Sequence, residues 1–271
     1  MSFLSTKFQG FGYRLELIEE CKRLKKSGKY IPKDYKKIIF NNPHRYDDFI
    51  NILCFIDNNS ETNLIDIGAN VGQFTKDFTK FFPNNKTALL FEPIKKLRTD
   101  IDNNLKNICD YELFSVGLSD EKGLKNLKYE ESNTTLASLK SYSQDANSFY
   151  NKKNIIEEEI EINRLDNYLD YIKDNKNLII KIDVQGNEVE TIKGGLSVIN
   201  LSSVLILECS FAFEYENEDP SISESLKLLN KVDMSPIIFQ NYGRKISNYS
   251  FERDVIFCKK NLLNKIYFKN Y

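Results

Sequence analysis

The stretch at residues 63–75, NLIDIGANVGQFT, constrains the fold of this chain more than any other part of the sequence. Its largely apolar residues 64–67 predict a short buried strand, and Gly68 and Gly72 predict a tight turn after it. A helix is expected to begin near Gln73. Glycines let the backbone bend sharply and approach a ligand, and the start of the helix directs unpaired N–H groups at the same place. The stretch therefore predicts a strand, a turn and a helix that together bind a polar cofactor.

An acidic residue follows the next predicted strand. An apolar run precedes Glu92, and a carboxylate at such a strand end can accept both hydroxyls of a ribose. The spacing Gly68-x-x-x-Gly72 differs from the G-x-G-x-x-G pattern of dinucleotide sites. Asn70 lies inside this turn and Asp66 just before it, and an acidic strand end favours a cationic ligand such as the sulfonium of S-adenosylmethionine. We therefore expect this cofactor, the alternative being a turn that needs glycine for its geometry.

Composition fits one α/β domain with embellishments. The chain has 271 residues, of which 41% are hydrophobic and 28% are charged, and its formal net charge is −1. This balance gives no global field toward nucleic acid or an anionic membrane, so we expect a small-molecule or glycan partner. Five scattered cysteines without CxxC pairs, and no run of roughly 18 apolar residues, predict a soluble protein of the cytoplasm.

Strands and helices alternate along the chain after the glycine turn. The predicted segments are strands at 86–92, 111–118, 177–183 and 204–207, and helices at 94–105, 188–193 and 222–232. Such a rhythm predicts a parallel sheet with right-handed crossovers. Two late apolar runs, at 236–240 and 254–258, predict an antiparallel strand pair that closes the sheet.

The chain is expected to form one globular unit with two additions. Residues 1–60 predict an N-terminal helical cap, with helices within 1–30 and at 46–57, before a core at 61–271. Within 124–162 the segments 124–129 and 157–162 predict a hairpin, and the polar span 131–154 predicts a long loop. We interpret that loop as a lid or substrate clamp, with disorder as the alternative.

Four acidic residues are expected at one edge of the sheet, since the carboxyl ends of parallel strands meet there. Asp66 and Glu92 are accounted for by the cofactor, whereas Asp183 and Glu208 are not, which makes both of them candidate catalytic residues. We expect Asp183 to act as a general base or to hold the substrate. The alternative is that it caps the helix that follows it. Lys181 faces the same side of its strand. A divalent metal held by Asp183 and Glu208 is not indicated, because two carboxylates are too few to specify a site.

His44 is the single histidine and a second candidate for the general base, because its ordinary pKa lies near neutrality. The alternative is a turn or surface residue, as expected for a histidine that follows Pro43. Asp166 near the start of a predicted helix is expected to be structural.

Five motifs together resemble the FkbM family of S-adenosylmethionine-dependent methyltransferases. They are IDIGANVGQFT, LLFEP, VGLSDEKG, INRLDNYL and LIIKIDVQGNEVETIKGG, and the resemblance covers roughly residues 62–260. It implies a Rossmann-like seven-stranded methyltransferase sheet with helices on both faces and an antiparallel last strand. It also implies O-methylation of sugar or polyketide-like hydroxyls, as in surface polysaccharide biosynthesis.

The resemblance further implies a division of the cofactor site, to which Gly72 contributes through the turn. The methionine moiety is expected near Asp66, Gly68 and Asn70, the ribose on Glu92, and the adenine near Val116, Gly117 and Leu118. Two departures affect the substrate side: the family more often has Glu where Gln185 stands, and residues 134–138 only loosely match its Ser-rich stretch.

Other functions stay open at this stage. The methyl group could go to a nitrogen or a carboxylate of a small metabolite. A nicotinamide-dependent dehydrogenase is disfavoured by the missing third glycine and by the closing strand pair. A non-catalytic cofactor-binding protein is the third alternative. The sequence predicts no oligomeric state.

Overall fold

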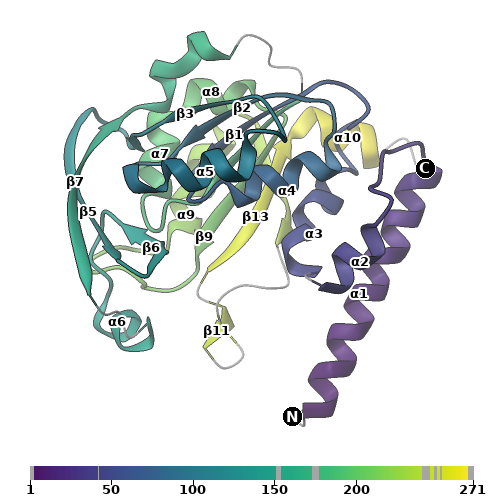
Figure 1. Cartoon of the computed structure of the whole chain (residues 1–271), viewed down its shortest axis with the longest axis horizontal. Coiled ribbons are helices and arrows are strands. Elements are labelled where there is room, and N and C mark those ends of the chain that lie inside the picture. The colour runs from purple at the N-terminus through teal and green to yellow at the C-terminus, as the bar shows by residue number, and fades with distance from the viewer. Residues whose placement is uncertain are drawn as a thin grey trace.

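A seven-stranded sheet forms the centre of the protein (Figure 1). The computed structural model describes residues 3–41, 43–150, 154–172, 177–239, 245–246, 249–250 and 252–267. In spatial order the strands are β10 (Met234–Phe239), β13 (Glu252–Lys259), β9 (Val204–Ser210), β8 (Leu178–Ile182), β1 (Thr62–Ile67), β2 (Asn85–Phe91) and β3 (Tyr111–Phe114). β13 is antiparallel to both neighbours, and the other pairs are parallel. The expected Rossmann-like methyltransferase sheet with an antiparallel last strand is confirmed.

Helices cover both faces of this sheet, because side chains along each buried strand alternate between two apolar cores. Leu64 packs in one core and Ile65 in the other. The first face carries α4 (Gln73–Phe81) and α5 (Arg98–Leu105). The second carries the 3-10 helix η2 (Leu165–Tyr171) with α7 (Glu188–Gly194), α8 (Leu196–Leu201) and α9 (Ser221–Asn230).

Three helices precede the sheet: α1 (Phe3–Lys26), α2 (Tyr35–Asn41) and α3 (Pro43–Ile52). The start of α1 projects away from the body of the molecule (Figure 1). α3 joins the first face through Phe49, whose ring centroid lies 5.1 Å from Phe74 and 6.0 Å from Phe78 of α4. α2 was not predicted. The division of the chain into a cap and a core at residue 60 stays a prediction.

A second sheet lies beside the first. Its order is β4 (Gly117–Leu118), β7 (Ile155–Asn163), β5 (Gly123–Glu130) and β6 (Asn133–Ser138). β5 and β7 are antiparallel from Gly123↔Ile162 to Glu130↔Ile155, so the predicted pairing of these segments is confirmed. The predicted strand at 111–118 is wrong in its second half, because the chain leaves the main sheet after Phe114 and β4 pairs with β7.

The span 131–154 is not the long loop that its polar composition predicted. It contains β6 and the helix α6 (Gln144–Tyr150), which we call together the β6–α6 segment. Tyr142 packs against Tyr150 and Tyr215, with ring centroids 5.3 Å and 4.8 Å away. The segment is therefore held by contacts to a distant part of the chain, the loop after β9.

The remaining elements are short. They are the 3-10 helix η1 (Lys95–Leu97), the strands β11 (Lys245–Ile246) and β12 (Tyr249–Ser250), and the helix α10 (Lys260–Tyr267). The predicted turn at 241–244 lies outside the described residues. Within the described part of the chain, no helix combines the length and the apolar character needed to cross a membrane.

Candidate active site

A cavity of about 150 Å³ lies at the carboxyl ends of β1, β2 and β8. The second sheet forms its other side through Leu127 and Ile160. Of the residues expected to bind the cofactor or the acceptor, the wall contains Gly68, Asn70, Glu92, Val116, Gly117, Leu118 and Asp183. Asp66, Gly72 and Glu208 are not wall residues. The carboxyl edge thus gathers most of the predicted site around one space.

The glycines of the turn are required by close packing within the chain. Gly68 has φ +80°, and a Cβ added there would lie 1.8 Å from the backbone carbonyl oxygen of Asp183. Gly72 has φ +73°, and its Cβ would lie 3.1 Å from Leu105 of α5. The sequence predicted that the backbone of the turn approaches a ligand at these glycines. The structure adds that the chain after β8 crowds a side chain at Gly68 and that α5 crowds one at Gly72.

Glu92 organises the wall beneath the turn. Its two carboxylate oxygens accept hydrogen bonds from the backbone N–H groups of Asn70 and Ile94, each at 2.8 Å. The side chain is 6% exposed. Burial raises the pKa of Glu92 to about 7, and the two backbone hydrogen bonds act in the opposite direction. Each oxygen keeps further acceptor capacity toward the cavity.

Asp66 lies behind the wall. It is buried, and its carboxylate accepts a hydrogen bond from the Thr75 hydroxyl at 2.7 Å. Burial raises its pKa above the ordinary value, opposed by the Thr75 hydrogen bond and the Lys181 ammonium. Asp66 therefore links β1 to α4.

The opposite part of the wall is backbone from β4. The Leu118 carbonyl accepts hydrogen bonds from the Asn187 amide at 2.7 Å and from the Thr191 hydroxyl at 3.0 Å. Asn187 is 3% exposed and also lines the cavity. Sequence reasoning missed its role, although it stands in the motif that follows β8.

Asp183 stands just beyond β8 and forms an ion pair with Lys181, with 2.7 Å between Nζ and Oδ2. Burial by itself would raise the pKa of Asp183, but the Lys181 ammonium and hydrogen bonds outweigh burial and lower that pKa to about 2. Burial would lower the pKa of Lys181, but the surrounding carboxylates raise it. The pair is therefore ionised, and Asp183 presents a carboxylate to the cavity.

Glu208 lies next to Asp183 on the neighbouring strand. The amide nitrogen of Gln185 donates to Asp183 Oδ1 at 3.0 Å and to Glu208 Oε2. Burial, together with the negative charges of Asp183, Glu252 and Asp254, raises the pKa of Glu208 well above its ordinary value. Gln185, which the sequence marked only as a departure from the family, thus connects the two predicted acids.

Two other predictions fall outside this cluster. His44 lies in α3, but its side chain is outside the described part of the structure. Asp166 accepts hydrogen bonds from the backbone N–H groups of Ser197 and Val198, both at the start of α8 and not of its own helix. Among the described residues, no group of three or more His, Cys, Asp or Glu is arranged to hold a metal.

The β6–α6 segment lines one side of the cavity. Thr134 lines the cavity and accepts a hydrogen bond from the Asn70 amide at 3.0 Å. The Ser138 hydroxyl donates to the Gln185 carbonyl at 2.6 Å. The segment therefore contacts both the glycine turn and the loop after β8.

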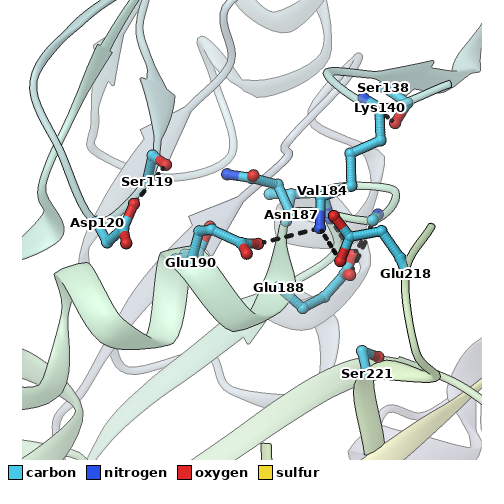
Figure 2. A network of polar contacts seen from close by, with 12 residues as sticks. Ser119, Asp120, Ser138, Lys140, Val184, Asn187, Glu188, Glu190, Glu218 and Ser221 are labelled. Carbon is cyan, nitrogen blue, oxygen red and sulfur yellow. Dashed lines mark hydrogen bonds and ion pairs between the residues drawn. The ribbon is translucent and has the colours of Figure 1, made fainter. Parts of the chain in front are cut away.

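Lys140 adds an ionic contact to the same segment. Figure 2 shows its side chain extending toward Glu190 of α7 and Glu218, which precedes α9. The ion-pair distances are 3.4 Å and 3.2 Å. The Lys140 side chain is 18% exposed, so these contacts are partly shielded from solvent. The Lys140 ammonium thus connects the β6–α6 segment to α7 and to the residues before α9.

The family model described as "Methyltransferase FkbM domain" matches residues 66–245. The chain belongs to the FkbM methyltransferase family. It is therefore an S-adenosylmethionine-dependent methyltransferase, as the motifs predicted. The matched range of the FkbM domain contains the glycine turn, the second sheet, Asp183 and Glu208.

Solved structures with a detectable likeness share little sequence with this FkbM protein. A putative rRNA-methylase from Clostridium thermocellum has 10% identity and a TM-score of 0.45, over 80% of this chain and 97% of that chain. Precorrin-6y C5,15-methyltransferase from Geobacter metallireducens GS-15 has 12% identity and a TM-score of 0.37, over 74% and 82%. A search of curated protein sequences gives no match.

Proposed function

We propose that the protein transfers a methyl group from S-adenosylmethionine to a hydroxyl of a sugar or a glycan-related small molecule. The observation that carries this proposal is the position of the Asp183 carboxyl group, which pairs with Lys181 and lies on the cavity wall, beside the turn expected to hold the cofactor. A carboxylate at this position can accept the hydrogen bond of an acceptor hydroxyl and orient it.

The residues of the cavity fit the adenosyl part of the cofactor. Glu92 is a buried carboxylate on a wall that also contains apolar Leu127 and Ile160, and its remaining lone pairs suit two ribose hydroxyls. The backbone of Val116, Gly117 and Leu118 would border the adenine. Gly68 and Asn70 would border the methionine part.

Bound S-adenosylmethionine supplies an electrophilic methyl group on a positively charged sulfur. The acceptor hydroxyl becomes strongly acidic as its oxygen bonds to carbon, so a weakly basic carboxylate such as Asp183 suffices to take its proton. His44 is the second candidate for this role. Otherwise the protein contributes by aligning the acceptor hydroxyl with the methyl group, which can lower the activation barrier by about 7 kcal/mol or more.

Two features favour a sugar-like acceptor. Lys181, Asp183 and Gln185 offer a donor and several acceptors at one edge, which suits neighbouring hydroxyls. Phe211 and Phe213, in the loop after β9, are 37% and 69% exposed and offer ring faces near that edge. Tyr142 and Tyr150, by contrast, pack in the ring cluster of the β6–α6 segment. All five cysteines are free thiols, which supports a reducing compartment such as the cytoplasm.

Calorimetric titration with S-adenosylhomocysteine and with NAD tests the cofactor, and we expect heat only with the first. Candidate glycans are then screened for a mass gain of one methylene group. Asp183→Asn should keep cofactor binding and lower turnover by about 10²–10⁴-fold. Asp100→Asn, a change at an exposed position of α5, is the matched control. Full turnover in both Asp183→Asn and His44→Ala would contradict the proposed proton acceptors.

A further inference from the structure

The carboxamide of Gln185 contacts two acids from adjacent strands at once. Its single nitrogen donates one hydrogen bond to Asp183, beyond β8, and one to Glu208 of β9. Gln185 is 6% exposed and lines the cavity. The two carboxyl groups also contact each other directly, and the carboxamide uses both of its N–H donors on this pair.

The backbone of Gln185 is fixed in an uncommon conformation. Its φ is +50°, in the left-handed region that residues with a Cβ seldom adopt and that often marks functional sites. Ser138 holds its carbonyl, and the next N–H, from Gly186, donates to Glu188 at 3.0 Å. A Cβ on Gly186 would lie 2.6 Å from the Tyr215 ring. The surrounding structure therefore dictates where the carboxamide points.

Charged groups from several elements of the described structure face the two carboxyls. They are Asp66 of β1, Lys181 of β8, Asp254 and Glu252 of β13, and Asp48 of α3, which reaches the cluster through a hydrogen bond with Asp254. Glu188 of α7, a fifth element, also faces Asp183. The Lys181 ammonium lowers the pKa of Asp183, whereas burial and the neighbouring carboxylates raise the pKa of Glu208. The pKa values of the two acids are therefore shifted in opposite directions, and the charge of each acid affects the titration of the other.

We propose that Gln185 is a positioning residue that joins Asp183 and Glu208 into one proton-accepting unit for the acceptor hydroxyl. This inference rests on the proposed function. As the bond from the acceptor oxygen to the methyl carbon forms, the bond from that carbon to sulfur breaks and sulfur keeps its electrons. The hydroxyl proton goes to Asp183. The neutral amide holds both carboxyls in place without adding a third negative charge beside them.

The titration of the two carboxyls tests this role without a known acceptor. Carbon-13 NMR of labelled Asp and Glu side chains, assigned with Asp183→Asn and Glu208→Gln, follows both groups from acid to alkaline pH. In Gln185→Met, which removes both donors at similar volume, we expect the pair to titrate about one pH unit higher. In Gln185→Glu, which keeps the shape, the added acid should raise the titration of Glu208 further.

Gln73→Met is the matched control, since Gln73 also donates to a carboxylate, Asp77, at 3.0 Å, but lies outside the cavity wall. It should leave the pair unchanged. The inference would be overturned if both carboxyls titrated as in the wild type in Gln185→Met or in Gln185→Glu. If one of these variants does not fold, the other variant alone provides the test. With a methylated acceptor in hand, the pH profile of turnover should move with the NMR titration.

The two proposals fail in different ways. If the protein does not bind S-adenosylhomocysteine, the proposed function is contradicted, but the NMR titration of Asp183 and Glu208 still reports on the role of Gln185. A protein that binds S-adenosylhomocysteine and methylates glycans, with the same carboxyl titrations in wild type and both Gln185 variants, contradicts this inference alone.

Discussion

Gly68 is the residue at which the ends of two strands come closest. Its missing side chain lets the carbonyl of Asp183 approach the turn, and the N–H of Asp183 in turn donates to the Ile67 carbonyl at 3.0 Å. The cofactor turn and the proposed proton acceptor are therefore placed by the same contact. A change at this position should affect both.

Gly68→Ala should lower the free energy of unfolding by about 2–4 kcal/mol, because it adds a clash at 1.8 Å and a strained φ of +80°. Chemical denaturation measures the change. Gly123→Ala is the matched control, since nothing lies within 4 Å of a Cβ there. Equal stability of the two variants would show that the turn relaxes freely.

Glu92→Gln should weaken binding of S-adenosylhomocysteine by roughly 10- to 100-fold. The amide that replaces the carboxylate has one oxygen for two backbone N–H donors, so it disturbs Asn70 and cannot serve both ribose hydroxyls. Calorimetry gives the affinities, with the exposed change Glu112→Gln as control. An unchanged affinity would remove Glu92 from the proposed ribose site.

At the scale of elements, the β6–α6 segment contributes several residues to one wall of the cavity. It is held by the Asn70 and Gln185 contacts, by the tyrosine rings, and by Lys140. Only the last of these contacts is ionic, so it can be removed without changing the packing of the rings.

Lys140→Met should increase the dissociation rate of S-adenosylhomocysteine about 5-fold, because loss of two partly buried ion pairs costs roughly 1 kcal/mol of the closed arrangement. Stopped-flow fluorescence of a labelled ligand measures the rate. Lys128→Met removes an exposed ion pair with Glu157 on the same sheet and should leave the rate unchanged. The same rate in both variants would show that the segment does not limit release.

The sequence predicted some elements well because their signal is local. β1 and β8 are apolar runs that end at a glycine turn and at an aspartate, so the strands and their acidic ends were predictable. β6 was not, because Leu136 and Ser138 are its buried residues and most of the others are polar. α6 depends on rings brought together from Tyr142 and Tyr215, a contact that no local pattern contains. The hydrogen bonds of Gln185 to both Asp183 and Glu208 were not predictable for the same reason, because they join residues from two separate parts of the chain.

For the whole molecule, the mainly parallel sheet and the edge at which the acids gather followed from the alternation of strands and helices. The exchange of the chain from the main sheet to the second sheet after Phe114 did not, because it depends on how Gly117 packs against Ile160 and Ile162. The contribution of β13 and α3 to the acid cluster was not predictable either, because these elements come from distant parts of the chain.

The stability of the whole protein should fall between about pH 5 and pH 8. Burial raises the pKa of both Glu92 and Glu188 to about 7, from an ordinary value of 4.5. In this range the folded protein binds more protons than the unfolded chain, so the stabilisation is present at low pH and is lost as the pH rises through 7. Each carboxyl should contribute roughly 2–3 kcal/mol to the change.

Thermal unfolding at several pH values in the absence of cofactor checks this expectation. Glu188→Gln should flatten the dependence, whereas Glu157→Gln, at a 54% exposed side chain, should leave it as in the wild type. A stability that rises from pH 5 to pH 8 would contradict the assignment of these two buried acids.

The reversed direction of β13 has a consequence for how this enzyme can change. Because the strand runs against β9, its first residues, and not its last, lie beside the reaction edge, where Asp254 pairs with Glu208. The residues proposed to bind the methyl donor come from earlier segments of the chain, and in the proposed arrangement these late residues border the acceptor. Substitutions near Glu252 should therefore change which acceptor is methylated without changing the residues proposed to bind the methyl donor.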